Sequence, residues 1–236
     1  RMEVLRLNQE RILFLFLLAC FALPSSPALA KLLINEIDYD QPGGDTSEFI
    51  EIYNSGDTAV DLAGISLVFI NGNNNSIYQS ISLSGRVEAR GFFVACSDPS
   101  QVNLCTMALP FSIQNGPADG IGLVTDYNTA NASIEDSVIY AGALQLAAND
   151  PLLAFIEAQP APLDSAEINT ALSRLPDGFD TDDNSLDFHL ACSSPGAANK
   201  HNVLHCQLPA TFCGVSHSAI HTLQGGQLSS ELQGQV

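Results

Sequence analysis

The acidic segment DGFDTDDNSLD carries the residue types best suited to hold a metal ion. Asp180, Asp182 and Asn184 stand at alternate positions in it, and Asp187 follows. Closely spaced carboxylate and amide oxygens are the ligands that calcium prefers. Ser185 stands where an EF-hand has its glycine, and no glutamate follows at the bidentate position, so the segment is not an EF-hand. We favour a solvated turn, and we carry a looser calcium site at these four residues as the candidate metal site of the chain.

Three glutamates near the start of the chain suggest a second kind of chemistry. Glu36, Glu48 and Glu51 fall on two neighbouring strand-like segments. Paired carboxylates that line a cleft can act as general acid and base. The alternative is structural: Glu36 and Glu51 would accept hydrogen bonds from backbone or hydroxyl groups. We favour the structural alternative and predict no catalytic residues in this chain.

A group of histidines and cysteines near the end has spacing that suits a zinc ion. His-x-x-x-His occurs twice and flanks two cysteines, and such ligands fit a tetrahedral site. The alternative is a disulfide between Cys206 and Cys213, which an oxidising compartment favours. The residues are His201, His205, Cys206, Cys213, His217 and His221.

Motifs that mark the common catalytic sites are absent from the sequence. It has no Gly-x-Ser-x-Gly elbow, no phosphate-binding loop and no His-Glu-x-x-His. The candidate residues named above therefore depend on the strands and turns that position them.

Short strand-like segments separated by turn residues dominate the first 200 residues. LLINEIDY, EFIEIYN, GISLVFIN, SIYQSISL, GFFVAC and DGIGLVT are rich in β-branched and aromatic residues, and Gly, Asn and Pro clusters separate them. A strand near Leu172 and a last strand in LDFHLA follow. This spacing predicts an all-β sandwich. Residues 141–159 are the one stretch that could hold a helix, which Pro151 limits, and we interpret the stretch as a long connection between strands.

The segment LLINEIDYDQPGGDTSEFIEIYNSGDTAVDLAGISLVFIN, with FSIQNGPADGIGLV and SPGAAN in that order, resembles the lamin-tail domain family. The resemblance covers about residues 32–199 and implies an immunoglobulin-like β-sandwich at residues 31–199. It implies a binding or spacing module without catalysis of its own. The extended pattern is similar to the version at the front of bacterial extracellular nucleases.

The composition changes after Lys200, and AIHTLQGGQLSSELQGQV resembles the entry of the OB-like domain in those nucleases. Residues 200–236 are therefore expected to form a linker and the stub of an OB-like domain. The resemblance implies the N-terminal part of a metal-dependent extracellular endonuclease whose catalytic domain is absent here. The alternative is a stand-alone secreted or surface-attached binding or adhesion protein, stabilised by calcium.

The first 30 residues have the pattern of a secretory signal peptide. Basic residues precede an apolar run, and SSPALA ends in a small-x-small site, which predicts cleavage after Ala30. We expect a secreted protein. The alternative is a lipoprotein anchored to the membrane at Cys20, which stands in LLAC.

The formal net charge of −18 limits the partners. Nucleic acid phosphates require clustered Lys and Arg, so we expect no direct nucleic-acid binding. An extracellular or surface ligand of unspecified chemistry is the expected partner. Cysteines of an exported chain form disulfides, and Cys96 with Cys105 is the predicted pair. One thiol among Cys192, Cys206 and Cys213 is then left over.

Overall fold

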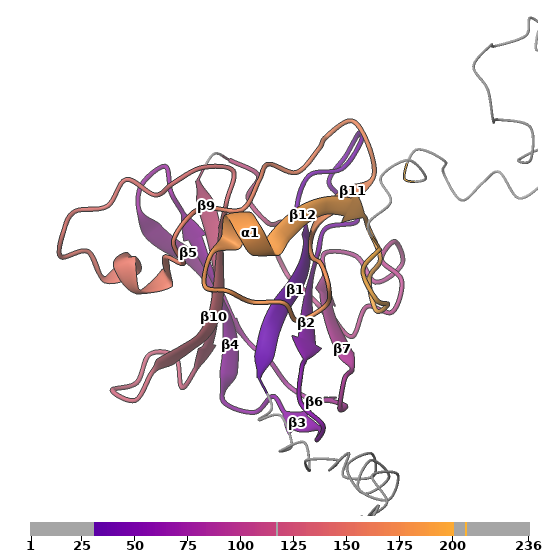
Figure 1. Ribbon diagram of the computed structural model, residues 1–236, viewed down its shortest axis with the longest axis horizontal. Coiled ribbons are helices and arrows are strands. Elements are labelled where there is room, and N and C mark those ends of the chain that lie inside the picture. The colour runs from indigo at the N-terminus through magenta and orange to yellow at the C-terminus, as the bar shows by residue number, and fades with distance from the viewer. Residues whose placement is uncertain (1–30, 117, 201–205, 207–236) are drawn as a thin grey trace, which may run out of the picture.

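The computed structural model describes residues 31–116, 118–200 and 206. Figure 1 shows their strands in two facing sheets. The larger sheet has the order β12-β11-β1-β2-β7-β8. Its strands are β1 (Leu32–Asp38), β2 (Phe49–Asn54), β7 (Phe92–Cys96), β8 (Met107–Ala108), β11 (Thr170–Arg174) and β12 (Phe188–Cys192).

The smaller sheet has four strands in the order β10-β9-β4-β5. They are β4 (Ile65–Asn71), β5 (Ser76–Ser82), β9 (Asp119–Thr125) and β10 (Ser133–Tyr140), and all neighbours are antiparallel. A separate two-stranded sheet pairs β3 (Val60–Asp61) with β6 (Arg86–Val87). The described residues thus form a β-sandwich.

The main core lies between the two sheets. Ile37, Ile50 and Ile52 of the six-stranded sheet join Leu67 and Ile121 of the four-stranded sheet in one buried cluster. These residues alternate with residues of the opposite face, as the two-residue period of a strand requires. The strand pattern thereby determines which side chains reach the outer faces of the sandwich.

Both outer faces are covered in part by loops. On the four-stranded sheet, Val68 and Ile139 pack against Leu152 and Phe155 of the 3-10 helix η2 (Pro151–Phe155), which Figure 1 shows beside that sheet. On the six-stranded sheet, Phe49 packs against Val102 from the loop that follows β7. The covering segments therefore hold apolar contacts of their own.

The six strands predicted from β-branched and aromatic runs are confirmed as β1, β2, β4, β5, β7 and β9, and those predicted near Leu172 and in LDFHLA as β11 and β12. Strand β10 was not predicted. Residues 141–159 belong to a long connection between β10 and β11, as expected, but the expectation that no other stretch could hold a helix was wrong. Residues 141–159 hold only the 3-10 helix η2. The α-helix among the described residues is α1 (Asn184–Asp187). Asp183 caps its N-terminus, where the Asp183 side chain accepts a hydrogen bond from the backbone N–H of Ser185.

The disulfide predicted between Cys96 and Cys105 is confirmed. A second disulfide joins Cys192 to Cys206, so the alternative pairing of Cys206 with Cys213 was wrong. Cys213 lies outside the described residues. This second disulfide joins Cys206 back to the end of β12, 14 residues earlier. The spacing of the cysteines in the sequence did not indicate this pairing.

Within the residues that the structure describes, no helix has the length and apolar character needed to cross a membrane. The division into residues 1–30, 31–199 and 200–236 stays a prediction, because most residues outside 31–200 are not described.

Candidate functional site

Buried carboxyl groups occupy the outer face of the six-stranded sheet at its centre. A bulge in β1 lies between Ile34 and Glu36, after which Glu36 stands opposite Glu51 of β2. Ile37 points into the core, so Glu36 and Asp38 share the outer face. All three carboxyl-bearing residues are at most 1% exposed. Charged groups are costly to bury, so each must be neutral or fully hydrogen-bonded.

Glu36 is held by hydroxyl and backbone donors. Its Oε1 accepts hydrogen bonds from Ser173 Oγ at 3.1 Å and from the Ser194 N–H at 3.0 Å, and its Oε2 accepts one from Ser194 Oγ at 3.2 Å. Burial, together with the nearby charge of Glu51, raises the pKa of Glu36 to about 9, against the effect of these donors. The Glu36 carboxyl is therefore protonated at neutral pH.

Glu51 is held by the segment that follows β12. Its Oε2 accepts a hydrogen bond from the Gly196 N–H at 2.7 Å, and its Oε1 accepts one from Asn35 Nδ2 at 2.9 Å. Burial raises the pKa of Glu51 to about 7. The prediction that Glu36 and Glu51 accept backbone and hydroxyl hydrogen bonds is confirmed.

The residues 193–199 form a cover, here called the C-terminal cover, over this carboxyl pair. Besides Ser194 and Gly196, Asn199 donates from Nδ2 to the backbone oxygens of Asn35 at 3.2 Å and Arg174 at 3.1 Å. The cover therefore bonds to both β1 and β11. The resemblance identified SPGAAN as the usual ending of the family. In the structure this segment follows β12 and bonds to the carboxyl groups of Glu36 and Glu51.

Glu48 does not join the other two glutamates. It precedes β2, and its Oε2 accepts a hydrogen bond from the backbone N–H of Ile113 at 3.1 Å. Burial raises the pKa of Glu48 to about 7. Because Glu48 and Glu51 are three positions apart in extended chain, their side chains lie on opposite faces.

A buried arginine connects the two sheets. Arg174 of β11 is fully buried and pairs through Nη2 with Asp136 of β10 at 3.0 Å, and through Nη1 with Asp187 of α1 at 3.0 Å. Its Nε donates to the Ile34 carbonyl at 2.8 Å, and its guanidinium carbon lies 4.5 Å from the ring centroid of Phe188. Burial raises the pKa of Asp136, and the charge of Arg174 acts against that rise.

The four predicted calcium ligands lie beside this arginine, with different environments. Asp187 accepts hydrogen bonds from Arg174 and from both donors of Thr181. The Asn184 amide oxygen accepts from the Ile139 N–H at 2.8 Å. Protein donors thus already occupy the oxygens of two of the four residues.

The other two residues are closer to solvent. Asp182 is exposed. Asp180 pairs with Lys31 and with Arg174. Burial opposes the ionisation of Asp180, but the hydrogen bond from Lys31 and the charge of Arg174 hold its pKa below the usual value. Calcium binding at Asp180, Asp182, Asn184 and Asp187 stays a prediction.

A different carboxylate group has metal-ligand spacing. One oxygen each from Asp136, Glu157 and Asp180 lies within 4.8 Å of the others. Two of these carboxylates pair with Arg174. The guanidinium of Arg174 already supplies a positive charge to these carboxylates, so no metal ion is needed to account for their proximity.

The predicted zinc ligands His201, His205, Cys213, His217 and His221 lie outside the described residues. Cys206 is described and forms the disulfide with Cys192. A disulfide sulfur is not a thiolate, so Cys206 is not available as a zinc ligand in this structure.

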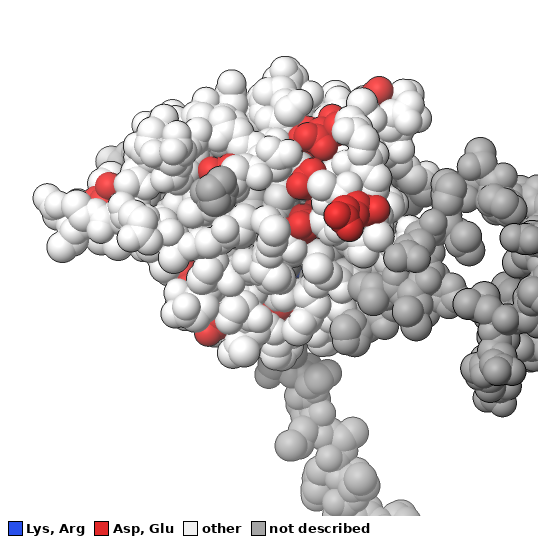
Figure 2. All heavy atoms as spheres, turned by 90° about the horizontal axis from the view of Figure 1, so that it is seen from above, with Lys and Arg blue, Asp and Glu red and all other residues white. Residues whose placement is uncertain are grey.

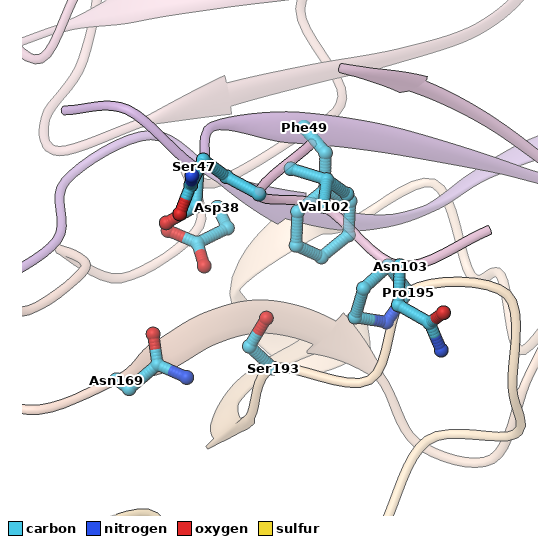
Figure 3. Close-up of a pocket in the computed structure, with 9 residues that line it drawn as sticks. Asp38, Ser47, Phe49, Val102, Asn103, Asn169, Ser193 and Pro195 are labelled. Carbon is cyan, nitrogen blue, oxygen red and sulfur yellow. The ribbon is translucent and has the colours of Figure 1, made fainter. Parts of the chain in front are cut away.

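A polar pocket of about 190 Å³ lies on the same outer face as the carboxyl pair. Figure 3 shows Asn169 and Ser193 across the pocket from Asp38, Ser47 and Phe49. Its residues come from β1, from β2 and the segment just before it, from the loop after β7, from the segment just before β11 and from the C-terminal cover. They are Asp38, Ser47, Phe49, Gln101, Val102, Asn103, Asn169, Ser193 and Pro195.

Asp38 is the one titratable residue in that lining. Its Oδ1 accepts a hydrogen bond from Gln41 Nε2 at 2.5 Å, and the Ser193 side chain also hydrogen-bonds to it. Burial, with the nearby charge of Asp164, raises the pKa of Asp38 well above its usual range. The pocket is therefore polar and close to neutral.

The sequence did not single out Arg174 or the pocket residues. The signal for Arg174 was its place in an apolar strand, where a charged side chain must find buried partners. Asn103 and Asn169 stand in different loops, and the pairing of strands brings these loops together. The spacing of these residues in the sequence does not indicate that the two loops lie close together.

Figure 2 shows the molecule from above the view of Figure 1, and Asp and Glu but no Lys or Arg are visible on that face. This distribution agrees with the net charge of −18. Phosphate groups would be repelled from such a surface.

Comparison with known proteins agrees with the fold. The family model described as Lamin Tail Domain matches residues 25–143, which include β1 to β10. A search of curated proteins found no match. The match covers half of the chain, and the β-sandwich is the fold that the resemblance implied. This chain belongs to the lamin tail domain family.

Proposed function

We propose that this chain is a non-catalytic accessory module of a secreted protein, and that the protein is an extracellular nuclease. The observation that carries the non-catalytic role is the state of the carboxyl groups. Glu36, Glu51 and Asp136 are buried and bonded to groups of the fold. A general acid or base must reach its substrate, and these groups are covered.

Two further observations support export. The disulfides Cys96–Cys105 and Cys192–Cys206 are typical of proteins from oxidising compartments. The first 30 residues have the order of a signal peptide. Mass spectrometry of the exported protein tests this directly. A new N-terminus at Lys31 is expected, whereas a lipid-modified N-terminal Cys20 would favour membrane anchoring, and an intact leader would contradict export.

The nuclease parentage is supported by the resemblance of the last residues to an OB-like entry. A plasmid-cleavage assay with Mg²⁺, Mn²⁺, Ca²⁺ or chelator tests the non-catalytic role. We expect no cleavage under any condition, and metal-dependent cleavage by the pure chain would overturn the module proposal.

The reading frame after the codon for Val236 tests the parentage separately. A frame that continues through an OB-like stretch into a metal-dependent nuclease domain supports it. A stop codon there would favour the second candidate, a self-standing binding or adhesion protein stabilised by calcium. The exposed carboxylate of Asp182 next to Asp180 is the feature that favours this second candidate.

A further inference from the structure

The polar pocket beside the carboxyl pair has walls that two disulfides hold. The Cys96–Cys105 bond closes the loop that supplies Gln101, Val102 and Asn103. The Cys192–Cys206 bond closes the segment that supplies Ser193 and Pro195. The pocket therefore lies between two covalently closed loops.

Hydrogen bonds fix each wall further. In the first loop, Asp98 accepts from the backbone N–H groups of Ser100 and Val102, at 2.8 and 3.0 Å. In the C-terminal cover, Ser194 and Gly196 bond to Glu36 and Glu51 on either side of Pro195. A ligand that enters meets ordered walls, so little conformational entropy is lost when it binds.

The first loop also holds a residue in an uncommon backbone conformation. Leu104 has φ of +53° and is 61% exposed. Its side chain lies against Gly196, where an added Cβ would come within 2.5 Å of Leu104 Cδ1. Positive φ is unfavourable for a residue of this size. The contact thus joins the two loops that supply pocket residues, and it requires a glycine at position 196, where φ is +77°.

The lining determines the class of ligand. Asn103, Asn169 and Gln101 offer carboxamides, which both donate and accept hydrogen bonds, and Ser47 and Ser193 offer hydroxyls. Phe49, Val102 and Pro195 supply an apolar part of the wall. The only carboxyl group, on Asp38, is 1% exposed and already bonded to Gln41. Such a lining suits a neutral molecule that carries several hydroxyl groups and one apolar face.

The size of the pocket limits the ligand further. Drug-sized ligands occupy pockets of about 300–1,000 Å³, and this pocket has about 190 Å³. One six-membered ring with its hydroxyl groups is of suitable size. We propose that this pocket binds a single neutral sugar ring, either free or as a residue of an extracellular polysaccharide. The proposal rests on the proposed function of an accessory binding module and names its ligand.

The experiment uses the full chain with its disulfides intact. The probes are glucose, galactose, mannose, N-acetylglucosamine and their trisaccharides, measured by saturation-transfer NMR and by calorimetry. Binding of at least one sugar is expected. Binding of a trisaccharide but not of its monosaccharide points to a polysaccharide as the source of the sugar. Equal affinity for the monosaccharide and the trisaccharide points to a free sugar. Both results support the proposal.

Two variants test the location. Asn103 and Asn169 are exposed, so Asn103→Ala and Asn169→Ala are expected to leave the melting temperature unchanged. Each should weaken sugar binding at least tenfold, because each removes a side chain that can bond to a hydroxyl group. Asn131→Ala, an exposed asparagine outside the pocket, is the matched control and should bind as the unaltered chain does.

A chelator separates a sugar from a cation. Sugar binding by the unaltered chain should persist in excess EDTA, because the lining offers carboxamide and hydroxyl groups. Calcium binding that Asp38→Asn abolishes, without sugar binding by the unaltered chain, would overturn the proposal. Absence of binding across the whole panel would also overturn it. Neither result would affect the module role, which the cleavage assay and the reading frame test independently.

Discussion

Glu36 and Glu51 stand directly opposite each other on adjacent strands, and both side chains are inaccessible to solvent. Like charges at this position of a sheet repel each other, so the pair is compatible with the fold only when at least one carboxyl is protonated. The hydrogen bonds from Ser194 and Gly196 hold both carboxyls under the C-terminal cover.

The free energy of unfolding should fall as the pH rises from about 4.5 to 9. Both folded pKa values, about 9 for Glu36 and about 7 for Glu51, lie above the unfolded value of 4.5. The stabilising contribution is therefore complete below pH 4.5 and is lost as the pH passes through 7 and then 9. Each raised group contributes a slope of up to about 1.4 kcal/mol per pH unit. Urea unfolding at several pH values measures it.

Glu36→Gln should reduce this slope most between pH 7 and 9, because glutamine resembles the protonated acid at every pH. Glu167→Gln changes an exposed glutamate and should leave the slope as it was. Equal slopes in the unaltered chain and in Glu36→Gln would show that Glu36 does not titrate as proposed.

Replacing Arg174 should destabilise the sandwich severely. Arg174→Met leaves the buried carboxylates of Asp136 and Asp187 without their partner, which typically costs about 3–5 kcal/mol. Arg174→Lys should give a smaller loss, since it keeps the charge without the guanidinium geometry. Arg90→Ala removes an exposed pair with Asp57 and should change the melting temperature little. Similar melting curves for Arg174→Met and Arg90→Ala would contradict the central role of Arg174.

The residues matched by the family model should not fold without those that follow. A fragment of residues 31–143 lacks β11, β12, Arg174 and the C-terminal cover, so Glu36 and Asp136 lose their main partners. We expect broad, poorly dispersed amide NMR signals from it, and dispersed signals from residues 31–206. A well-dispersed spectrum of the short fragment would mean that the late strands are dispensable.

Calcium binding near Asp180 and Asp182 predicts a rise in melting temperature with calcium concentration, because a ligand of the folded state stabilises it. The rise should disappear in Asp182→Asn, whose side chain is exposed, and should persist in Asp150→Asn as a control for general charge effects. A melting temperature that neither saturating calcium nor chelator changes would remove the calcium prediction.

The sequence revealed most of the fold because alternation determines most of its strands. Segments such as FIEIYN place Ile50 and Ile52 on one face and Glu51 on the other, and the structure has this arrangement. Strand β10 escaped prediction because Glu135 and Asp136 interrupt its apolar pattern. Asp136 is buried there because Arg174, 38 residues later, and the backbone N–H of Ile34 both donate hydrogen bonds to it.

The site was less accessible to sequence reasoning for the same physical reason. The acidic segment around Asp180 has the composition of a solvated calcium loop, yet Asn184 and Asp187 are buried and bonded within the fold. Whether an aspartate faces solvent or an arginine depends on strand pairing over long distances. Composition near the residue contains no such information.

The place of β1 in its sheet has a consequence for the order of events during synthesis. β1 is the first of the described strands to be made, but its two neighbours are β2, which follows next, and β11, which begins at Thr170. At about 5–20 residues per second, roughly 10–30 s pass before β11 and the C-terminal cover emerge. During that interval Glu36 has no partner in Ser173 or Ser194. The six-stranded sheet can therefore be completed only after nearly all of the sandwich has been made.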